Sequence, residues 1–300
     1  MKIFAIVVTY NGMRWYDRCF GSLRNSDMPV ETIVIDNAST DETVSYIKEN
    51  FPEVCLIESK ENLGFAKANN IGMRYALDHD ADYVFLLNQD AWVEKDTLSK
   101  LVQTFYDNEN VGIASPIHLN GGHSGLDWGF VNYVSGEFIS DSYMQKLKKY
   151  YQVKFVNAAA WLISAECIRK VGGFDTLLFV HYGEDDNYCQ RVMYHGYKVL
   201  INTQCSACHD REFRMSFEEQ YRHNNFGEDF SRKLKLKYGN INLKMDMDLL
   251  ICEQKKSIFK SIVRFSFRGV KEHYDMIAIL KKIEESRRKN IFGMCVWLNC

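Results

Sequence analysis

The 300-residue sequence has three prolines, no long apolar run and no internal repeat. With so little proline and no low-complexity linker, no hinge can be recognised in the sequence. No apolar run approaches the about 20 residues of a membrane-spanning helix, and the run at residues 3–8 is too short for a signal-peptide core. We therefore expect a cytoplasmic protein whose nine cysteines are mostly reduced thiols.

The glycine-rich loops of two large nucleotide-binding classes are also missing. The sequence has no G-x-G-x-x-G after its first predicted strand and no G-x-x-x-x-G-K-[ST], which argues against a dehydrogenase and a P-loop enzyme. The net charge of −2 gives no sign of a nucleic-acid partner, and we expect none. Positive charge is concentrated at residues 251–300, which hold 11 Lys or Arg against 5 Asp or Glu.

One cysteine–histidine pattern, Cys205-x-x-Cys208-His209, matches the motif of c-type haem attachment. Haem attachment of that type would require export, and a zinc site would require a second pair of ligands that does not stand out in the sequence. We therefore expect neither group, which leaves His209 for another role.

Short apolar runs alternate with helical patterns over the first two thirds of the chain. The runs predict strands at residues 2–8, 30–35, 54–57, 83–87, 155–163 and 197–201. Helices are predicted at 13–26, from a capping box at Ser39–Glu42 to about residue 50, at 62–79, from Val93 onward, at 164–171 and at 184–196. This alternation predicts an α/β fold with a mainly parallel sheet flanked by helices.

Two polar side chains, Asn88 and Asp90, directly follow the buried strand at 83–87. Their spacing puts both on one face at the carboxyl end of the strand, the edge at which ligands bind in open α/β sheets. A carboxylate at this edge can hold Mg²⁺ or Mn²⁺ together with substrate phosphate. The alternative is that Asp90 caps the next helix.

Gly183 precedes three acids, Glu184, Asp185 and Asp186, and then a run of helix formers. This order predicts the start of a helix, and Gly196 predicts its end. The helix dipole favours acids in a first turn, so their presence alone proves little. We expect the same dipole to keep their pKa low, which suits a carboxylate that accepts a proton near neutral pH.

Two segments allow two interpretations each. Residues 117–153 mix glycines with aromatic residues, which suits either a long surface loop with a hairpin or a loop that binds a sugar acceptor. The C-terminal part is helical and basic, and apolar residues such as Ile258, Ile262 and Phe265 alternate there with cations. This pattern suits either a solvated helix that packs on the rest of the chain or a helix on a membrane surface.

Five motifs resemble, in order, those of the family 2 glycosyltransferases, which are inverting enzymes with the GT-A fold. Within that family the chain is most similar to the bacterial rhamnosyltransferase-like branch. The motifs are VTYNG at 8–12, IDNASTD at 35–41, NLGF at 62–65, LNQD at 87–90, and GGFD at 172–175 with EDD at 184–186. Together they cover residues 1–210, about two thirds of the chain.

The resemblance implies roles for individual residues. The nucleoside would be held by Thr9, Tyr10, Asn11 and Asp36, and the diphosphate would lie along Asn62, Gly64, Lys67 and Asn70. Asn88 and Asp90 would stand in the acidic metal-binding motif, with Asp90 as the ligand and His209 approaching the metal and the diphosphate. Asp185 would be the catalytic base, with Glu184 as its rival. The chain departs from the acid-x-acid form of the motif by having Asn88 first.

By this resemblance, the protein moves a sugar from a nucleoside diphosphate-sugar to a hydroxyl of a glycan or lipid-linked glycan in cell-surface polysaccharide assembly, with a divalent cation as cofactor. The alternatives are a sugar-phosphate nucleotidyltransferase, which should carry a glycine-rich loop after strand one, and a non-catalytic nucleotide-sugar-binding subunit. We expect a GT-A catalytic domain at 1–212 and a helical, basic extension at 213–300. The charge of that extension suggests peripheral contact with the anionic inner leaflet of the membrane.

Overall fold

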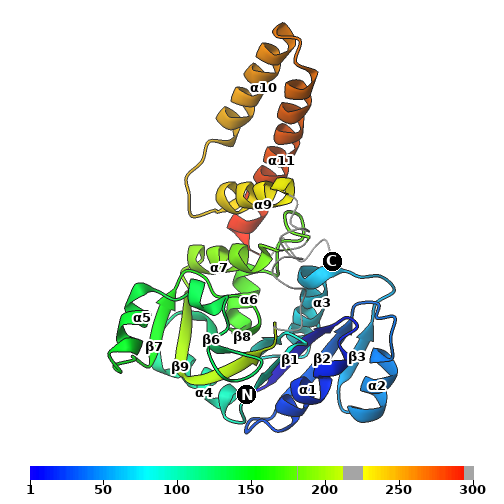
Figure 1. Ribbon diagram of the computed structural model, residues 1–300, viewed down its shortest axis with the longest axis vertical. Helices are drawn as coiled ribbons and strands as arrows, with labels where there is room; N and C mark the ends of the chain where they lie inside the picture. Colours follow the sequence, from blue (N-terminus) through cyan, green and yellow to red (C-terminus); the bar gives the residue numbers. More distant parts are fainter. Residues whose placement is uncertain (181, 212–225, 294–300) are drawn as a thin grey trace.

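The computed structural model describes residues 1–180, 182–211 and 226–293. It has an α/β body, from which a pair of C-terminal helices projects (Figure 1). The strands are β1 (Ile3–Thr9), β2 (Glu31–Asp36), β3 (Cys55–Glu58), β4 (Tyr83–Leu87), β5 (Ala91–Val93), β6 (Val111–Asn120), β7 (Tyr150–Val153), β8 (Ala160–Ser164) and β9 (Lys198–His209). The helices of the body are η1 (Met13–Trp15), α1 (Tyr16–Arg24), α2 (Thr43–Asn50), α3 (Gly64–Asp78), α4 (Thr97–Asp107), η2 (Phe130–Asn132), α5 (Gly136–Tyr143), α6 (Ala165–Val171) and α7 (Glu184–Tyr194).

The strands form one sheet in the order β3-β2-β1-β4-β8-β6-β9-β5, with β7 paired to β9. Strands β1 to β4 are parallel neighbours, and β8 runs antiparallel to both β4 and β6. Because β9 is parallel to β6, six of the nine strands share one direction, while β5, β7 and β8 oppose it. The predicted α/β fold with a mainly parallel sheet is confirmed.

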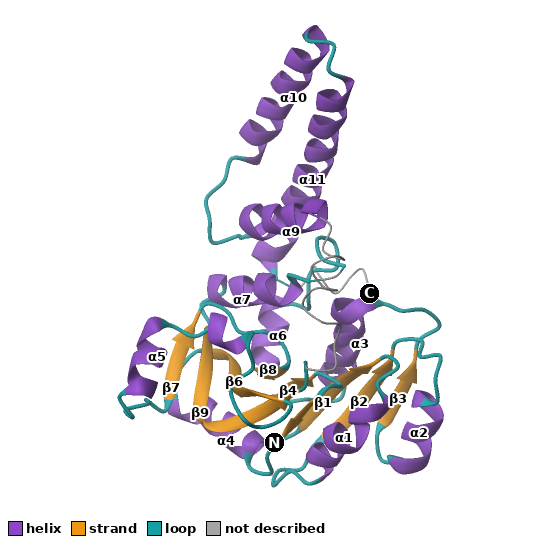
Figure 2. Ribbon diagram, in the orientation of Figure 1, coloured by secondary structure: helices purple, strands orange, loops and turns teal. Residues whose placement is uncertain are grey.

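Alternation along the strands divides the core into two layers, one on each face of the sheet (Figure 2). On β1, Ile3 and Val7 belong to the layer that α1, α2 and α4 cover. Phe4 and Ile6, whose side chains point the other way, belong to the layer covered by α3, α6 and α7. Residues 3–7 of β1 and 84–87 of β4 are buried and apolar on both faces of the sheet. This explains why the sequence shows continuous hydrophobic runs at these strands.

Two predicted helix starts are wrong. The helix expected from the capping box at Ser39 begins at Thr43, because the Ser39 hydroxyl instead donates to Asp36 Oδ1 at 2.6 Å. The helix expected from Val93 is preceded by a short strand, β5, which pairs antiparallel with the end of β9. Helix α4 begins only at Thr97, and Asp90 therefore lies at a turn between two strands rather than at a helix cap.

The later strands also differ from their predicted bounds. The strand predicted at 155–163 starts only at Ala160, and the strand predicted at 197–201 continues to His209. Residues 117–153 hold the end of β6, a short turn, η2, α5 and β7, so the long loop predicted there is largely ordered structure. Cys205 and Cys208 lie buried within β9, three residues apart, so their side chains point to opposite faces of the strand.

Among the described residues that follow the body, the helices are α9 (Phe226–Gly239), α10 (Met247–Val263) and α11 (Phe267–Phe292). Helices α10 and α11 form an antiparallel hairpin, and the far end of α11 returns to α6 and α7 (Figure 1). A third apolar cluster joins Leu178 and Phe179 of the body to Ile251 on α10 and Ile283 on α11. Within the described residues, no helix is both long and apolar enough to cross a membrane.

Candidate active site

The carboxyl ends of β1 and β2 bring Thr9 and Asp36 together as register partners. Asp36 is 2% exposed and accepts hydrogen bonds from the Thr9 hydroxyl at 3.1 Å, the Ser39 hydroxyl at 2.6 Å and the Ser39 backbone NH at 3.0 Å. These donors hold the carboxylate in one orientation at the sheet edge. The arrangement suits recognition of a nucleoside, as the resemblance implies.

The loop after β1 contacts the LNQD motif after β4 and the IDNASTD motif after β2. The Tyr10 backbone NH donates to Gln89 Oε1 at 2.8 Å, and Gln89 Nε2 donates back to the Tyr10 carbonyl at 3.1 Å. Asn11, in the left-handed region at φ 47°, accepts from the Thr40 backbone NH at 2.9 Å. The Tyr10 ring stays 44% exposed, so it is free to contact a ligand.

Residues predicted to lie along the diphosphate divide into two groups. Asn62 Oδ1 accepts from the Gly64 NH at 2.9 Å, and Gly64, at φ 74°, opens α3 with Lys67 half-buried in its first turn. Asn70, by contrast, is fully buried, and its amide bonds the Phe174 backbone in both directions, at 2.9 and 2.7 Å. Asn70 therefore ties α3 to the loop before α7, and a direct diphosphate contact would require these bonds to break.

Asp90 and His209, predicted as metal ligands, lie side by side although 119 positions separate them. Asp90 Oδ1 is 3.5 Å from His209 Nε2, and Asn88 Nδ2 is 3.4 Å from the same nitrogen. Adjacent ligands of an octahedral cation lie about 3 Å apart, so the Asp90–His209 pair fits a shared Mg²⁺ or Mn²⁺. In the described part of the chain no cluster of three or more such side chains could hold a metal, so phosphate oxygens and water would complete the shell.

Sequence reasoning missed Asp127 and Arg211, which flank His209. Arg211 Nε lies 2.9 Å from Asp127 Oδ2 and 3.2 Å from His209 Nδ1. Asp127 Oδ2 lies 3.7 Å from the same ring nitrogen, beyond hydrogen-bond distance, so Asp127 acts on His209 through Arg211, whose Nε donates to Nδ1. Asp127 lies in residues 117–153, the segment interpreted as either a surface loop or an acceptor loop. Its side chain is 1% exposed, and no local sequence pattern predicts this burial.

The acids of α7 have pKa values opposite to the expectation. Burial, helped by the neighbouring Asp185, raises the pKa of Glu184 to about 7. Burial also raises the pKa of Asp185 to about 6, with Asp186 adding to the shift. The predicted low pKa is wrong because the loss of water around these carboxyl groups outweighs the helix dipole.

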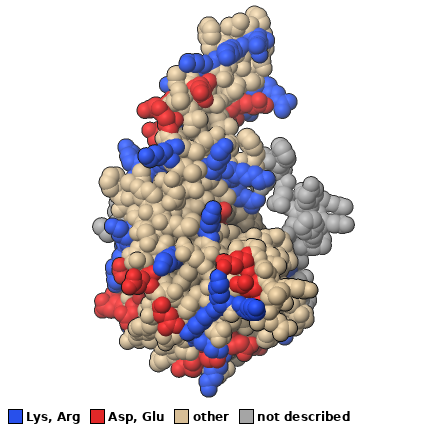
Figure 3. Space-filling model, turned by 90° about the vertical axis from the view of Figure 1, so that its left-hand side faces the viewer, with Lys and Arg blue, Asp and Glu red and all other residues tan. Residues whose placement is uncertain are grey.

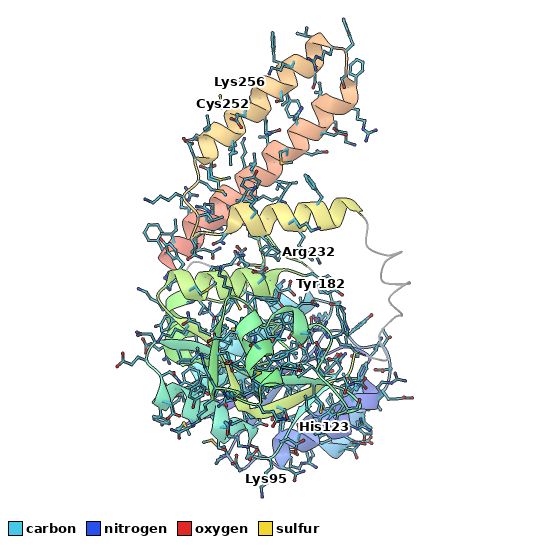
Figure 4. All side chains as sticks on the ribbon, turned by 60° about the vertical axis from the view of Figure 1, so that its left-hand side comes forward. Lys95, His123, Tyr182, Arg232, Cys252 and Lys256 are labelled. Atoms are coloured by element: carbon cyan, nitrogen blue, oxygen red, sulfur yellow. The ribbon has the colours of Figure 1, made fainter. Side chains whose placement is uncertain are left out.

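The three acids face different neighbours. The charge of Asp185 affects the pKa of Tyr133. Burial raises that pKa most, Arg211 lowers it, and Asp185 raises it further. Glu184 is instead next to Arg232 of α9, on the side of that helix that faces α7 (Figure 4). Asp186 accepts from Gln190 Nε2 at 3.0 Å within its own helix.

Tyr133 lies next to Arg211, which contacts His209. A Cβ added at Gly129 would come within 3.1 Å of the Tyr133 hydroxyl and 3.2 Å of Arg211 Nη2, so these two side chains converge there. The described residues thus include a carboxylate of raised pKa at the start of α7 and, at the end of β9, a buried pair that fits a cation. Such an arrangement can deprotonate a hydroxyl on one side of a substrate while charge is stabilised on the other.

The family model described as Glycosyl transferase family 2 matches residues 4–172. A dTDP-rhamnosyl transferase, RfbF, of Shigella flexneri is 27% identical over 201 residues, which are 67% of this chain and 66% of that protein. The chain thus spans just under two thirds of this relative.

Two solved structures share the fold. TarS of S. aureus in complex with UDP-GlcNAc has a TM-score of 0.56 at 18% identity, covering 82% of this chain and 68% of that one. The mannosyltransferase PcManGT of Pyrobaculum calidifontis, in complex with GDP-Man and Mn²⁺, has a TM-score of 0.54 at 17% identity, covering 97% and 87%. At these identities the structures support the GT-A fold alone. Because the family model matches more than half of its residues, the chain belongs to glycosyl transferase family 2.

Proposed function

We propose that this protein is an inverting glycosyltransferase that moves a hexosyl or deoxyhexosyl group from a nucleoside diphosphate-sugar to a hydroxyl of a glycan or lipid-linked glycan. The observation that carries the proposal is the contact of Asp90 with His209 just after β4, in a sheet whose neighbouring strands β1 and β2 end in the Thr9–Asp36 pair. The comparisons give no support to a nucleotidyltransferase or a non-catalytic subunit. The relatives suggest a role in cell-surface polysaccharide assembly.

The donor would lie across the carboxyl ends of β1, β2 and β4. Asp36 has its Oδ1 bonded by two hydroxyls, whereas Oδ2 accepts only the Ser39 NH among the described residues, so Oδ2 can accept a further bond from a nucleoside. Lys67, half-buried near the start of α3, supplies a positive charge for the diphosphate. GDP-Man with Mn²⁺ in one structure of this fold and UDP-GlcNAc in another support a nucleotide-sugar donor and a divalent cation.

A divalent cation, when bound, would neutralise charge that develops on the departing diphosphate. Asp90 and His209 would hold it, and Arg211, which pairs with Asp127 and donates to His209 Nδ1, would keep the ring oriented. Asp185 would take the proton of the acceptor hydroxyl from the opposite side of the sugar, as a single displacement with inversion requires. Its pKa of about 6 leaves it mostly ionised at neutral pH yet more basic than an ordinary carboxylate.

The function is tested by incubating the full chain with Mn²⁺, a panel of nucleotide-sugars that includes dTDP-rhamnose, UDP-GlcNAc and GDP-mannose, and glycan or lipid-linked glycan acceptors. We expect nucleoside diphosphate release that depends on the acceptor, with an inverted anomeric configuration in the product by NMR. Retention of configuration would rule out the single displacement. Full activity in excess EDTA would rule out the cation.

We propose the same domain boundary as the sequence suggested, with catalysis in residues 1–212 and a helical extension at 213–300. This assignment rests on the position of the motifs and on the change from alternating strands and helices to helices in residues 226–293, the part after β9 that the structure describes. We also propose that the protein works at the inner face of the membrane, where lipid-linked acceptors reside, and that the basic extension mediates this contact.

A further inference from the structure

The free end of the α10–α11 hairpin, which we call the hairpin tip, comprises residues 255–271. It contains six Lys or Arg and no Asp or Glu. All six cations are exposed, and they are Lys255, Lys256, Lys260, Arg264, Arg268 and Lys271. Figure 3 shows this end of the hairpin in blue and tan, with acidic side chains lying closer to the body, and Figure 4 labels Lys256 on α10.

The large apolar side chains of the hairpin tip also face solvent. Phe265 and Phe267 are each 85% exposed, and Phe259, Ile262 and Val263 are 69%, 56% and 62% exposed. These five residues lie within nine positions around a single turn. A contiguous apolar patch of this kind on a soluble surface marks an interaction site.

The interior of the hairpin tip is built from small residues instead. Gly269 lies so close to Ser261 that an added Cβ would come within 2.9 Å of the Ser261 hydroxyl. Ile258 is the only apolar side chain of the hairpin tip that is buried, at 8% exposure. The hairpin tip therefore has small residues inside and large apolar residues outside, the reverse of a hairpin stabilised by its own packing.

The backbone conformation of Phe265 is unfavourable for the fold, in addition to the exposure of its ring. Its φ of 52° places it in the left-handed region, which is strained for a residue with a Cβ and which Gly or Asn would occupy more easily. An aromatic ring held there with 85% exposure contributes little packing to offset that cost. A contact outside the chain accounts for both features.

We propose that the hairpin tip binds the surface of an anionic lipid bilayer, with Phe265 and Phe267 inserted among the headgroups and the cations paired with acidic lipids. Aromatic side chains surrounded by Lys and Arg, without acids, are the chemistry that such a surface recognises. This inference specifies the membrane contact of the proposed function, yet it requires no catalytic activity. The sequence pattern suggested a helix lying along the membrane with Ile258 on its apolar face, whereas Ile258 is buried at 8% exposure and the exposed apolar side chains lie at and next to the turn.

The hairpin would also set the distance between the bilayer and the active site. From Phe267 to Ser286, where α11 contacts the loop before α7, the helix rises about 28 Å. A chain docked by its hairpin tip would therefore hold its body away from the lipid surface. Such a geometry suits an acceptor hydroxyl on a glycan that extends from its lipid.

The test is flotation of the full chain with vesicles of phosphatidylcholine alone and of an equal mixture of phosphatidylcholine and phosphatidylglycerol. We expect binding to the mixed vesicles, with a decrease at high salt. The variant Phe265→Ser/Phe267→Ser should lose it, and Lys260→Gln/Arg264→Gln should weaken it by about thirtyfold, since each surface cation contributes about fivefold. Tyr143→Ser, which removes an aromatic ring that is 86% exposed on α5, is the matched control and should bind like the parent.

Three results would overturn the inference. One is no binding to the mixed vesicles, and another is equal binding by the parent and Phe265→Ser/Phe267→Ser, which would locate the contact elsewhere. The third is a parent chain that sediments as a dimer and ignores vesicles while Phe265→Ser/Phe267→Ser sediments as a monomer. That result would identify a second copy of this chain as the partner. Nucleoside diphosphate release in solution, measured in parallel, separates failure of this inference from failure of the proposed function.

Discussion

Asp185 and Glu184 are adjacent in sequence and both have raised pKa values, but the fold gives them different neighbours. Successive residues on a helix point about 100° apart, so only one of the two can face the edge that holds Asp90 and His209. We propose that this residue is Asp185, as the family resemblance implies; its charge, like that of Arg211, influences the pKa of Tyr133. Glu184 faces Arg232, which suits a role in joining α7 to α9.

We predict that Asp185→Asn lowers kcat by roughly 10²–10⁴-fold while nucleotide binding is kept, because the substitution removes the proton acceptor and preserves the shape. In the parent enzyme, kcat should rise with pH through about 6 and level off above 7, since protonation below the pKa of Asp185 inactivates the base. Steady-state kinetics from pH 5 to 8 measure both effects. Near-normal turnover by Asp185→Asn, together with loss of turnover in Glu184→Gln, would identify Glu184 rather than Asp185 as the base.

A second prediction concerns Glu184 and stability. Its folded pKa of about 7 exceeds the ordinary value of 4.5, so the native state binds more protons than the unfolded state between these values. The contribution of Glu184 to the free energy of unfolding should therefore fall as pH rises from about 4.5 to 7. The variant Glu184→Gln does not titrate at this position. The Tm of the variant minus the Tm of the parent should therefore increase from about pH 4.5 to about pH 7 and stay constant above that pH. Thermal unfolding at several pH values checks this, and a difference independent of pH would contradict it.

At the scale of elements, the end of α11 is fastened to the loop that leads into α7. Asp175 is buried and accepts from the Ser286 hydroxyl at 2.5 Å and Asn290 Nδ2 at 2.9 Å, both on α11. The other oxygen of Asp175 accepts from the backbone NH groups of Leu177 and Leu178. The C-terminal hairpin is thus connected directly to the segment that positions the acids of α7.

We predict that Asn290→Ala lowers the free energy of unfolding by about 1–3 kcal/mol, because it removes a hydrogen bond from a buried carboxylate. Turnover should also fall, since the loop before α7 loses a support. Urea unfolding and kcat are the two measurements. Ser257→Ala on the same hairpin removes only a hydroxyl bond to the Glu253 carbonyl and should stay within about 0.5 kcal/mol of the parent. An unchanged free energy of unfolding in Asn290→Ala would show that this contact does not fasten α11.

At the scale of the whole molecule, the proposed site draws on both halves of the sheet. Asp36 and Asp90 follow parallel strands of the first half, whereas Asp127, His209 and Asp185 come from later segments around β6, β9 and α7. A ligand that bridges these segments should stabilise the entire body rather than one part, because it binds only when they are folded together.

We therefore predict that a nucleoside diphosphate with Mn²⁺ raises Tm progressively with concentration, by an amount equivalent to about 2.7 kcal/mol at a hundred times Kd. The shift should be larger with Mn²⁺ than with EDTA, and Asp90→Ala should remove the difference while keeping a folded chain. Differential scanning fluorimetry against UDP, GDP and dTDP measures this and identifies the preferred base. Equal shifts with Mn²⁺ and EDTA in the parent would argue against the cation site.

The sequence alone determined the elements whose signals are local. Apolar runs specify β1 and β4, because a strand buried on both faces needs only a short continuous stretch of such residues. Gly183 followed by acids specified the start of α7, since a left-handed glycine and an acidic first turn are nearest-neighbour effects. The ordered motifs, read as a family resemblance, indicated Asp90, His209 and Asp185 before any geometry was known.

Only the tertiary structure decided which of these residues meet and what surrounds them. The contact of Asp90 with His209, the positions of Asp127 and Arg211, and the bond between Asn70 and Phe174 join segments far apart in the chain. Burial, which raised the pKa of Glu184 against its helix dipole, depends on atoms from other elements. The exposure of Phe265 is decided in the same way, by whether α11 covers the turn. Local sequence patterns extend over a few residues, whereas desolvation and contact are properties of the whole packed chain.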